Sequence, residues 1–227
     1  MNARQFTPVP FRSETVTARI QKPDGNGEMD EVTADIVFHF DALTGRSSRF
    51  VNFSPERIVR PDLDALEKLS RQFPCPFCRP NIDNVTTRFP ADLAPEGKIQ
   101  VGESVTFPNV NPYDIYCSVA VLSPDRHFIR LQDFDIDLIA NVFLGAQRYL
   151  HLVADYDKNA RWRFIGWNYL PPSGGSLVHP HIQCDAGYRP TVFQKTLFEA
   201  SYRWYAEFGT NYFEDLIRQE KELGERY

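Results

Sequence analysis

The sequence predicts an α+β fold in which helices flank an antiparallel sheet. Three observations support this class: short runs of β-branched and aromatic residues, one long amphipathic segment at 136–156, and 17 prolines among 227 residues. The proline content exceeds the usual share of about 5% and indicates many turns and extended segments. Hydrophobic residues make up 42% of the chain and charged residues 24%, which excludes wholesale disorder. The chain is long enough to bury a large core.

The N-terminal part predicts strands joined by tight turns, then a short helix and a loop. The segment Pro-Asp-Gly-Asn-Gly at 23–27 is typical of a turn. A helix is expected after Pro61, because leucines at 63, 66 and 69 share one helical face. Prolines at 74, 76, 80 and 90 predict a loop over 73–90. Strands are expected at 14–21, 33–40 and 48–53.

The rest of the chain predicts strands around one clear helix, followed by a helical C-terminal segment. The helix at 136–156 has apolar residues at three- and four-residue spacing, with Asp135 or Asp137 near its N-terminus. The segment 193–223 is expected to be helical, with an interruption near Gly209. Strands are expected at 98–107, 115–122, 162–169 and 178–183.

Charge and hydropathy exclude several classes of protein. The formal net charge of −5 disfavours a nucleic-acid partner, because such a protein needs a basic face. The longest apolar stretch is only a few residues around Val119–Leu122, so no membrane-spanning helix is expected. The first residues lack the apolar segment of a secretory signal, and we expect a cytoplasmic protein. We expect residues 1–40 to form strands packed on or extending a main domain over 41–227.

The densest chemical signal is the run Gly-Gly-Ser-Leu-Val-His-Pro-His-Ile-Gln at 174–183. Alternate residues of an extended chain share a face, so His179, His181 and Gln183 would point the same way. The two glycines and Ser176 offer backbone N–H groups and a hydroxyl to an anion. This pattern indicates a phosphate beside two imidazoles, and a surface strand with solvated histidines is the alternative.

Cys75-Pro76-Phe77-Cys78 is the second signal. A C-x-x-C pair is half of a zinc site or a redox pair, and the flanking prolines favour a rigid metal-binding turn. The histidines that could complete the site are His127 and His179, which leaves His181 for chemistry. The remaining candidates are expected to be structural: His39 in the core or at its rim, His151 on the long helix, and Cys117 and Cys184 as small apolar side chains.

Several segments follow one another in an order that a known family shares. They are Asp41–Gly45, residues 50–61, Cys75–Cys78 with Asn81, Phe107–Asn109, Ser123–Asp125, and Asn168 with the His-Pro-His-x-Gln run. In this order the chain resembles galactose-1-phosphate uridylyltransferase, a branch of the histidine-triad superfamily. The resemblance covers about residues 41–227, which matches the first half of the family's members and part of the linker. It implies a histidine-triad-like domain, as a natural half-length protein or as a fragment.

The resemblance also implies roles for individual residues. It implies a structural zinc ion on Cys75, Cys78, His127 and His179, although Arg126 is an alternative to His127 because the segment Ser-Pro-Asp-Arg-His is one residue longer than usual. It implies that His181 is the nucleophile. The implied substrate-binding residues are Asn168, Ser176 and Gln183 for phosphates, Arg57 and Arg60 for nucleotide or sugar phosphate, and Asn109 for the base or ribose.

The implied activity is transfer of a uridylyl group from a UDP-sugar to a sugar 1-phosphate, as in galactose metabolism, through a covalent nucleotidyl-histidine. The implied partners are a nucleoside-diphosphate sugar and a sugar 1-phosphate, with a homodimer left open. Two alternatives stay open: a nucleotidyl hydrolase or phosphorylase of the same superfamily, and a zinc-stabilised nucleotide-binding module without turnover. A nucleic-acid-binding zinc finger is excluded, because the gap from Cys78 to His127 is far too long.

Overall fold

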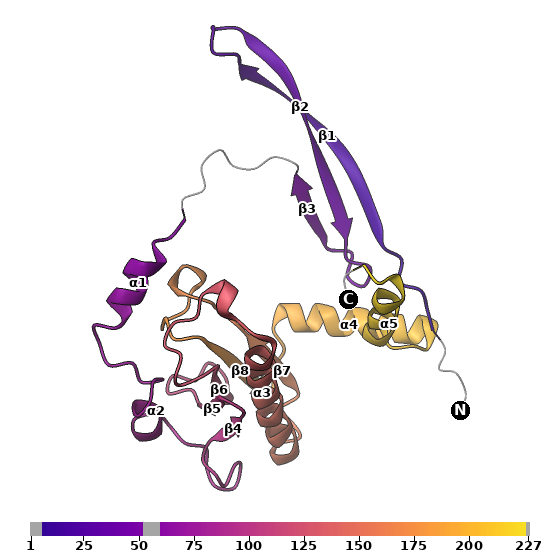
Figure 1. Ribbon diagram of the computed structural model, residues 1–227. Coiled ribbons are helices and arrows are strands. Elements are labelled where there is room, and N and C mark those ends of the chain that lie inside the picture. Colours follow the sequence, from indigo (N-terminus) through magenta and orange to yellow (C-terminus); the bar gives the residue numbers. More distant parts are fainter. Residues whose placement is uncertain (1–5, 52–59, 226–227) are drawn as a thin grey trace. The chain divides into compact units, whose positions relative to one another are not determined.

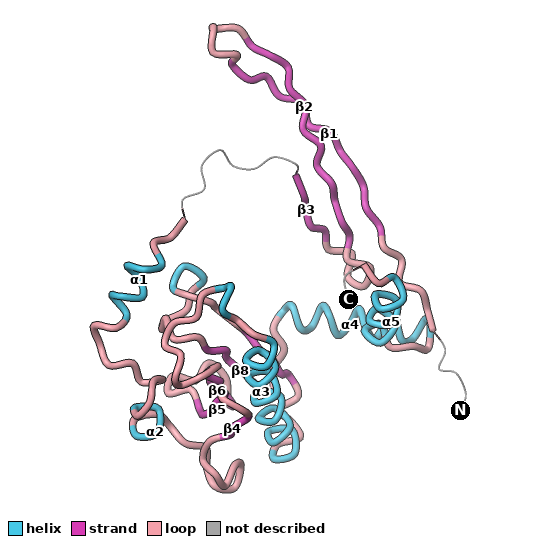
Figure 2. The backbone as a smooth tube through the Cα atoms, in the orientation of Figure 1, coloured by secondary structure: helices cyan, strands magenta, loops and turns pink. Residues whose placement is uncertain are grey.

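The computed structural model describes residues 6–51 and 60–225, which fall into two compact units (Figures 1 and 2). The first unit takes its residues from 1–59 and 191–227, and the second unit comprises 60–190. The chain therefore enters the second unit once and returns to the first.

The first unit contains a three-stranded antiparallel sheet. Its strands are β1 (Arg12–Pro23), β2 (Met29–Phe40) and β3 (Ser47–Val51), in the order β1-β2-β3. Strands β1 and β2 pair along their whole length and form the long hairpin of Figure 1. The expected turn at 23–27 joins them: Gly25 and Gly27 have φ angles of 91° and 96°, which glycine adopts without strain.

Two helices complete the first unit, α4 (Val192–Phe208) and α5 (Tyr212–Leu223). The expected interruption occurs at Gly209, whose φ of 72° ends α4, and the Asn211 side chain caps α5. Val9, Trp204 and Tyr212 form a small buried core between these helices and the N-terminal segment.

The two units divide the chain differently from the expected parts, 1–40 and 41–227. Residue 40 ends β2, which pairs with β3 from Ile36 to Phe40. The helices α4 and α5, expected in the main domain, group with the N-terminal strands. Pairing of β2 with β3 and packing of Val9 on Trp204 and Tyr212 hold these segments together.

The second unit is built on a five-stranded antiparallel sheet in the order β4-β5-β6-β8-β7. Strand β8 is paired on both sides, by β6 and by β7. Helix α3 (Ile136–Tyr156) contacts the sheet, and Asp135 caps it by accepting a hydrogen bond from the Leu138 backbone N–H at 2.7 Å. The strands are β4 (Ile99–Val101), β5 (Ser104–Pro108), β6 (Tyr116–Val121), β7 (Trp162–Gly166) and β8 (His181–Gly187).

The second unit also contains short helices, two of which precede its first strand. Helix α1 (Leu63–Ser70) is the one expected after Pro61, and α2 (Asn81–Asn84) lies within the segment expected to be a loop. Two 3-10 helices, Leu131–Asp133 and Pro171–Ser173, precede α3 and β8.

Three expected strands differ from those observed, the first being 162–169, which ends at Gly166 as β7, and the end of the expected strand 48–53 lies outside the described residues. The segment 98–107 forms the hairpin β4–β5, because Gly102 has a φ of 53° and turns the chain. A side chain there would be strained, because the φ is left-handed and a Cβ would lie 2.2 Å from Asn141 Nδ2, which would have to move. The last expected strand begins at His181 and not at 178. The residues before it follow a 3-10 helix and a left-handed Gly174, so they stay irregular.

The expected class is confirmed: the structure has antiparallel sheets flanked by helices. Among residues 6–51 and 60–225, none of the helices combines the length and apolar character that crossing a lipid bilayer demands.

Helix α3 offers a matched test of the main core. Leu138 is 2% exposed within that core and Leu144 is 52% exposed on the same helix. We expect Leu138→Ala to lower the free energy of unfolding by about 2–5 kcal/mol, because it removes buried apolar contacts and leaves a cavity. Leu144→Ala carries the same change in helix propensity and should cost less than about 1 kcal/mol. Urea denaturation measures both, and equal costs would contradict the packing of α3 on the sheet.

Candidate active site and metal centre

Successive side chains of strand β8 point alternately to the core and to the opposite face of the sheet. Ile182, Cys184 and Ala186 are fully buried in the core that includes α3. His181, Gln183 and Asp185 therefore point to the opposite face. On β6 the residues opposite them are Val121, Val119 and Cys117. One face of the sheet is thus a core face, and the other bears the predicted catalytic histidine.

The Cys75–Cys78 turn lies against this second face. Phe77, between the cysteines, is buried with Val105, Phe107, Val119 and Val121. Inside the turn the Cys78 backbone N–H donates to the Cys75 carbonyl at 3.3 Å, and the Asn81 side chain donates to the same oxygen at 2.9 Å. Burial of Phe77 and these two hydrogen bonds hold both sulfur atoms on one side of the turn.

Four predicted metal ligands converge there. One ligand atom from each of Cys75, Cys78, His127 and His179 lies within 4.8 Å of all the others. His127 comes from the loop after β6, and His179 from the segment just before β8. Arg126, the alternative to His127, instead forms ion pairs with Glu103 and Asp135 at 3.3 and 3.2 Å. The extra residue in this segment turns His127, and not Arg126, toward the cysteines.

In His127 and His179, hydrogen bonds occupy Nε2 and leave Nδ1 free to bind a metal. His179 Nε2 donates to the Ser123 carbonyl oxygen at 2.8 Å, because a carbonyl only accepts, and its Nδ1 lies 3.5 and 3.4 Å from the two sulfurs. Ser70 Oγ donates to the Glu67 carbonyl at 2.7 Å, so it accepts from His127 Nε2 at 2.9 Å. His127 Nδ1 then faces Cys78 Sγ at 3.2 Å. Both rings present an unprotonated Nδ1 to the sulfurs.

The electrostatics of the cluster fit a bound cation. Burial lowers the pKa of His179 to about 4, and burial with the nearby Arg71 lowers the pKa of His127, so both rings are neutral. Burial and the neighbouring Cys75 raise the pKa of Cys78 to about 11. A dication among these atoms would favour the thiolate and accept the neutral imidazoles. Two sulfurs and two nitrogens suit a tetrahedral soft-metal site.

His181 is next to this cluster but is not part of it. It is 7% exposed, and its Nδ1 donates to the His179 carbonyl oxygen at 2.8 Å. The ring of Phe77 lies edge-on to both histidines, with centroid distances of 5.3 Å to His181 and 6.0 Å to His179. Burial lowers the pKa of His181. The ring is therefore neutral, with its free lone pair on Nε2.

The glycine-rich segment and Asn168 adjoin each other. A Cβ at Gly175 would lie 2.8 Å from the Asn168 carbonyl oxygen, and a Cβ at Gly174 would lie 3.7 Å from Asn168 Nδ2. Asn168 and Ser176 are exposed, and Gln183 is half-buried two residues after His181. Asn168 therefore adjoins the glycine-rich segment, and Gln183 shares with His181 the face of β8 that is opposite the core.

The remaining predicted residues lie farther along the chain. Asn109 is half-buried at the end of β5, where its N–H donates to the Cys117 carbonyl at 2.9 Å. Arg60 is exposed before α1. Arg57 lies outside the described residues. As expected, Cys117 and Cys184 are buried.

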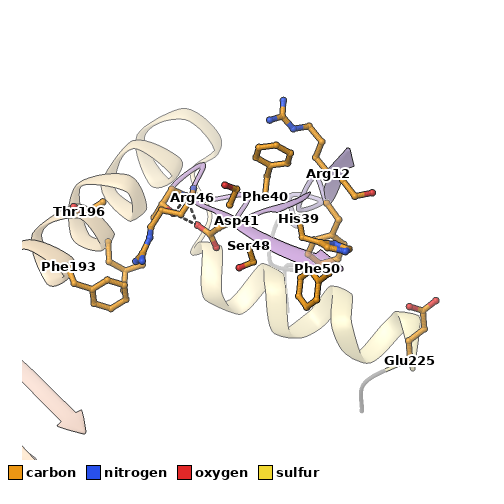
Figure 3. A pocket seen from close by; sticks show the side chains of 15 residues that line it. Arg12, His39, Phe40, Asp41, Arg46, Ser48, Phe50, Phe193, Thr196 and Glu225 are labelled. Carbon is orange, nitrogen blue, oxygen red and sulfur yellow. Dashed lines mark hydrogen bonds between the residues drawn. The ribbon is translucent and has the colours of Figure 1, made fainter. Parts of the chain in front are cut away.

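The first unit contains a separate hollow of about 800 Å³ (Figure 3). It is lined by the base of the hairpin, β3 and the start of α4. His39 is exposed there and meets Phe50 edge to face at 4.9 Å, so it lies at the rim and not in the core. The apolar neighbours Phe38 and Phe40 point to the other face of β2. Among the lining residues are none of the described metal-binding or catalytic candidates.

Two contributors to the site were missed by the sequence analysis. Ser70 fixes the tautomer of His127 from the last turn of α1, and no local pattern indicates that role. Phe77 packs between the metal cluster and His181, and it was passed over as the variable residue of the C-x-x-C pair. Its large apolar side chain inside the C-x-x-C pair was the available signal.

No family model matches the chain. An uncharacterized protein of Archaeoglobus fulgidus is 31% identical over 219 residues, which are 96% of this chain and 62% of the relative. The chain thus spans less than two thirds of the length of this relative.

Solved structures give the fold. An ADP-glucose phosphorylase from Arabidopsis thaliana, with bound ADP-glucose, matches 76% of this chain and 55% of its own at 19% identity and a TM-score of 0.52. A GalT-like protein of Arabidopsis thaliana matches 60% of this chain and 48% of its own at 17% identity and a TM-score of 0.49.

The metal cluster gives a direct test of the ligand assignment. We expect His127→Ala to reduce the bound metal from one ion per chain to well below one, because three ligands hold a structural ion poorly. Arg126→Ala should keep one ion, since its partners are exposed carboxylates. Elemental analysis after gel filtration measures both variants. Metal loss in Arg126→Ala with retention in His127→Ala would reverse the assignment.

The chain therefore shares the fold of this ADP-glucose phosphorylase.

Proposed function

We propose that the chain carries the catalytic site of a nucleotidyltransferase that takes a nucleoside monophosphate from a nucleoside-diphosphate sugar. The observation that carries this proposal is His181, a buried neutral imidazole with Nδ1 held by a carbonyl and Nε2 free. The ADP-glucose bound by the phosphorylase of the same fold supports a nucleotide sugar as donor. The sequence resemblance favours a uridylyl group as the group transferred.

The proposed step is a displacement at phosphorus. His181 Nε2 bonds to the α-phosphorus, and the bond from that phosphorus to the oxygen bridging the β-phosphate breaks. Sugar 1-phosphate leaves with the electron pair. Nδ1 keeps its proton, and the His179 carbonyl oxygen at 2.8 Å stabilises the positive ring of the nucleotidyl-histidine. Attack by an oxygen of the acceptor on the same phosphorus then releases His181.

Phosphoryl transfer depends mainly on alignment and on neutralising the phosphate oxygens. We assign this task to Asn168 and Ser176, which are exposed, and to Gln183, which shares the face of β8 with His181. The resemblance also implies two arginines, Arg57 and Arg60. Their guanidinium groups would place positive charge beside the phosphate of the leaving group or of the acceptor.

The acceptor distinguishes three versions of this reaction. A sugar 1-phosphate makes the protein a hexose-1-phosphate uridylyltransferase, inorganic phosphate makes it a phosphorylase, and water makes it a hydrolase. The fold shared with ADP-glucose phosphorylase favours inorganic phosphate as the second candidate for the acceptor. A binding module without turnover is disfavoured, because it has no need of an imidazole with a fixed tautomer.

We propose zinc as the metal held by Cys75, Cys78, His127 and His179. The two thiolate sulfurs and two imidazole nitrogens favour zinc over the oxygen-seeking ions Mg²⁺ and Ca²⁺. When bound, it would tie the Cys75–Cys78 turn to the start of β8 and so hold His181 in place, which is a structural role.

The covalent step predicts a change in intact mass. After incubation with UDP-glucose or ADP-glucose and no acceptor, the protein should gain one nucleotidyl group, seen by mass spectrometry. His181→Ala should gain none, because Nε2 is the bonding atom. His151→Ala should behave like the wild type, since His151 is exposed on α3. An adduct in His181→Ala would contradict the assignment. The acceptor is identified by loss of the isolated wild-type adduct, on addition of glucose 1-phosphate, on addition of phosphate, or in buffer alone if water is the acceptor.

We expect removal of the metal to destabilise the protein. A chelator should lower the melting temperature by about 10 °C or more, because several kcal/mol of metal binding is lost and each kcal/mol shifts the midpoint by roughly 2–4 °C at this size. Added Zn²⁺ should restore it. His181→Ala should keep one zinc ion and the same shift. An unchanged melting curve after complete metal removal would refute a structural zinc.

A further inference from the structure

The second unit has a pocket of its own at one edge of the five-stranded sheet. Its volume is about 360 Å³, and its lining includes residues of β4, which is the first strand of the described sheet and pairs there with β5. The buried side chains Ile99 and Val105 give it an apolar part, and its other lining residues are polar or charged. We call this space the edge pocket. It is large enough for a small organic anion.

The edge pocket is separate from the catalytic histidine on the same sheet. Val105 on β5 is opposite Val121 on β6, which is in turn opposite His181 on β8. Two strand spacings, about 10 Å, therefore separate Val105 from His181. Its lining includes none of the metal-binding, catalytic or substrate-binding candidates that the structure describes. A ligand in the edge pocket would not occupy the position of the reacting phosphate.

Positive charge is in excess in the edge pocket. Its charged lining residues are the cationic Arg79, Arg88, Lys98 and Arg148 and the acidic Asp83 and Glu96. Their net charge of +2 is opposite in sign to that of the whole chain, which is −5. A ligand with two negative charges would neutralise this local excess.

The two acidic residues are each paired with an arginine of the pocket. Arg79 Nη1 lies 3.4 Å from Asp83 Oδ2, and Arg148 Nη2 lies 3.6 Å from Glu96 Oε1. All four side chains are about half exposed, and ion pairs of this kind contribute little to stability. Both arginines can therefore turn toward a doubly charged ligand at small cost.

Arg88 has a guanidinium group that the protein leaves unused. Its side chain is exposed, and within residues 6–51 and 60–225 it forms neither an ion pair nor a hydrogen bond. The first atoms of the side chain lie against Gly97, where an added Cβ would be 3.3 Å from Arg88 Cβ. The base of the side chain is thus positioned by packing, while its planar fork of donors is available to a ligand.

Lys98 supplies a second cation beside Arg88. It is half-buried, and its Nζ donates to the Ile82 carbonyl oxygen and, at 2.7 Å, to Thr86 Oγ1. An ammonium group has three N–H donors, so one is left for a ligand. Burial and the charge of Arg88 lower the pKa of Lys98, against the opposing effect of Asp83. An anion next to both cations would offset the burial and the repulsion.

We propose that the edge pocket is a second anion site, which binds a dianionic phosphate group, either as inorganic phosphate or as the phosphate of a small ester. Arg88 would donate to two phosphate oxygens, and Lys98 would add a third charge-assisted hydrogen bond. Arg148 and Arg79 would supply further positive charge. A ligand with a single carboxylate would leave half of the excess charge uncompensated.

Calorimetric titration at constant ionic strength tests the proposal, with inorganic phosphate and glucose 1-phosphate as the two titrants. Arg88→Gln should weaken binding by about tenfold or more, because it removes charge-assisted hydrogen bonds. Arg148→Gln is a second variant and should weaken binding in the same direction. Arg189→Gln removes the same charge from an exposed position outside the pocket, so its affinity should stay within about twofold of the wild type. Thermal melting establishes that each variant is folded.

Ser176→Ala separates the edge pocket from the catalytic site, to which the proposed function also assigns phosphate. Weaker binding in Arg88→Gln with unchanged binding in Ser176→Ala would uphold the edge pocket. Loss of one of two binding events in each variant would uphold it as well. Weaker binding in Ser176→Ala alone would overturn it, and so would equal weakening in Arg88→Gln and Arg189→Gln. Absence of heat from both titrants at millimolar concentration would also overturn it.

The two titrants distinguish the sources of the phosphate group. Tighter binding of glucose 1-phosphate would uphold the site with an ester as its ligand, and tighter binding of inorganic phosphate would uphold it with the free ion. Neither result depends on turnover. Binding that requires Arg88, in a protein that forms no nucleotidyl adduct, would uphold the edge pocket and refute nucleotidyl transfer. An adduct without any phosphate binding that requires Arg88 would do the reverse.

Discussion

The site depends on the pairing of β8 between β6 and β7. A strand bonded on both sides cannot shift its register by one residue without exposing Ile182, Cys184 and Ala186, which are fully buried. That constraint fixes His181 and Gln183 on the opposite face. It also sets where the metal cluster must lie, because His179 is only two residues before His181.

Backbone carbonyls orient both histidines of the His-Pro-His segment. The Ser123 carbonyl holds His179 Nε2, and the His179 carbonyl holds His181 Nδ1. The two rings are thus held in opposite tautomers by neighbouring parts of one loop and strand. One presents Nδ1 to the cysteine sulfurs and the other keeps Nε2 for substrate. A hydrogen bond to the second ring nitrogen commonly sets the tautomer and orientation of a histidine that binds a metal or acts as a nucleophile.

Much of the fold could be predicted from local patterns. The hairpin turn at 23–27, the helix 136–156 and the break at Gly209 depend on glycine conformation, capping and apolar spacing, which act over a few residues. The hairpin β4–β5 was expected as one strand, because its turn rests on the single Gly102 within a run whose alternation is typical of one strand. The grouping of α4 and α5 with the N-terminal strands likewise depends on contacts such as Val9 with Trp204, far apart in sequence.

Three local motifs specify which residue types are available to act: the C-x-x-C turn, the His-Pro-His-x-Gln run and the glycine–serine segment. Tertiary structure decided between His127 and Arg126, because only packing shows which side chain reaches the cysteines. It also decided the tautomers, since Ser70 and Ser123 are more than 50 residues from the histidines that they contact. Hydrogen-bond partners so distant leave no trace in local sequence, because the fold alone brings them together.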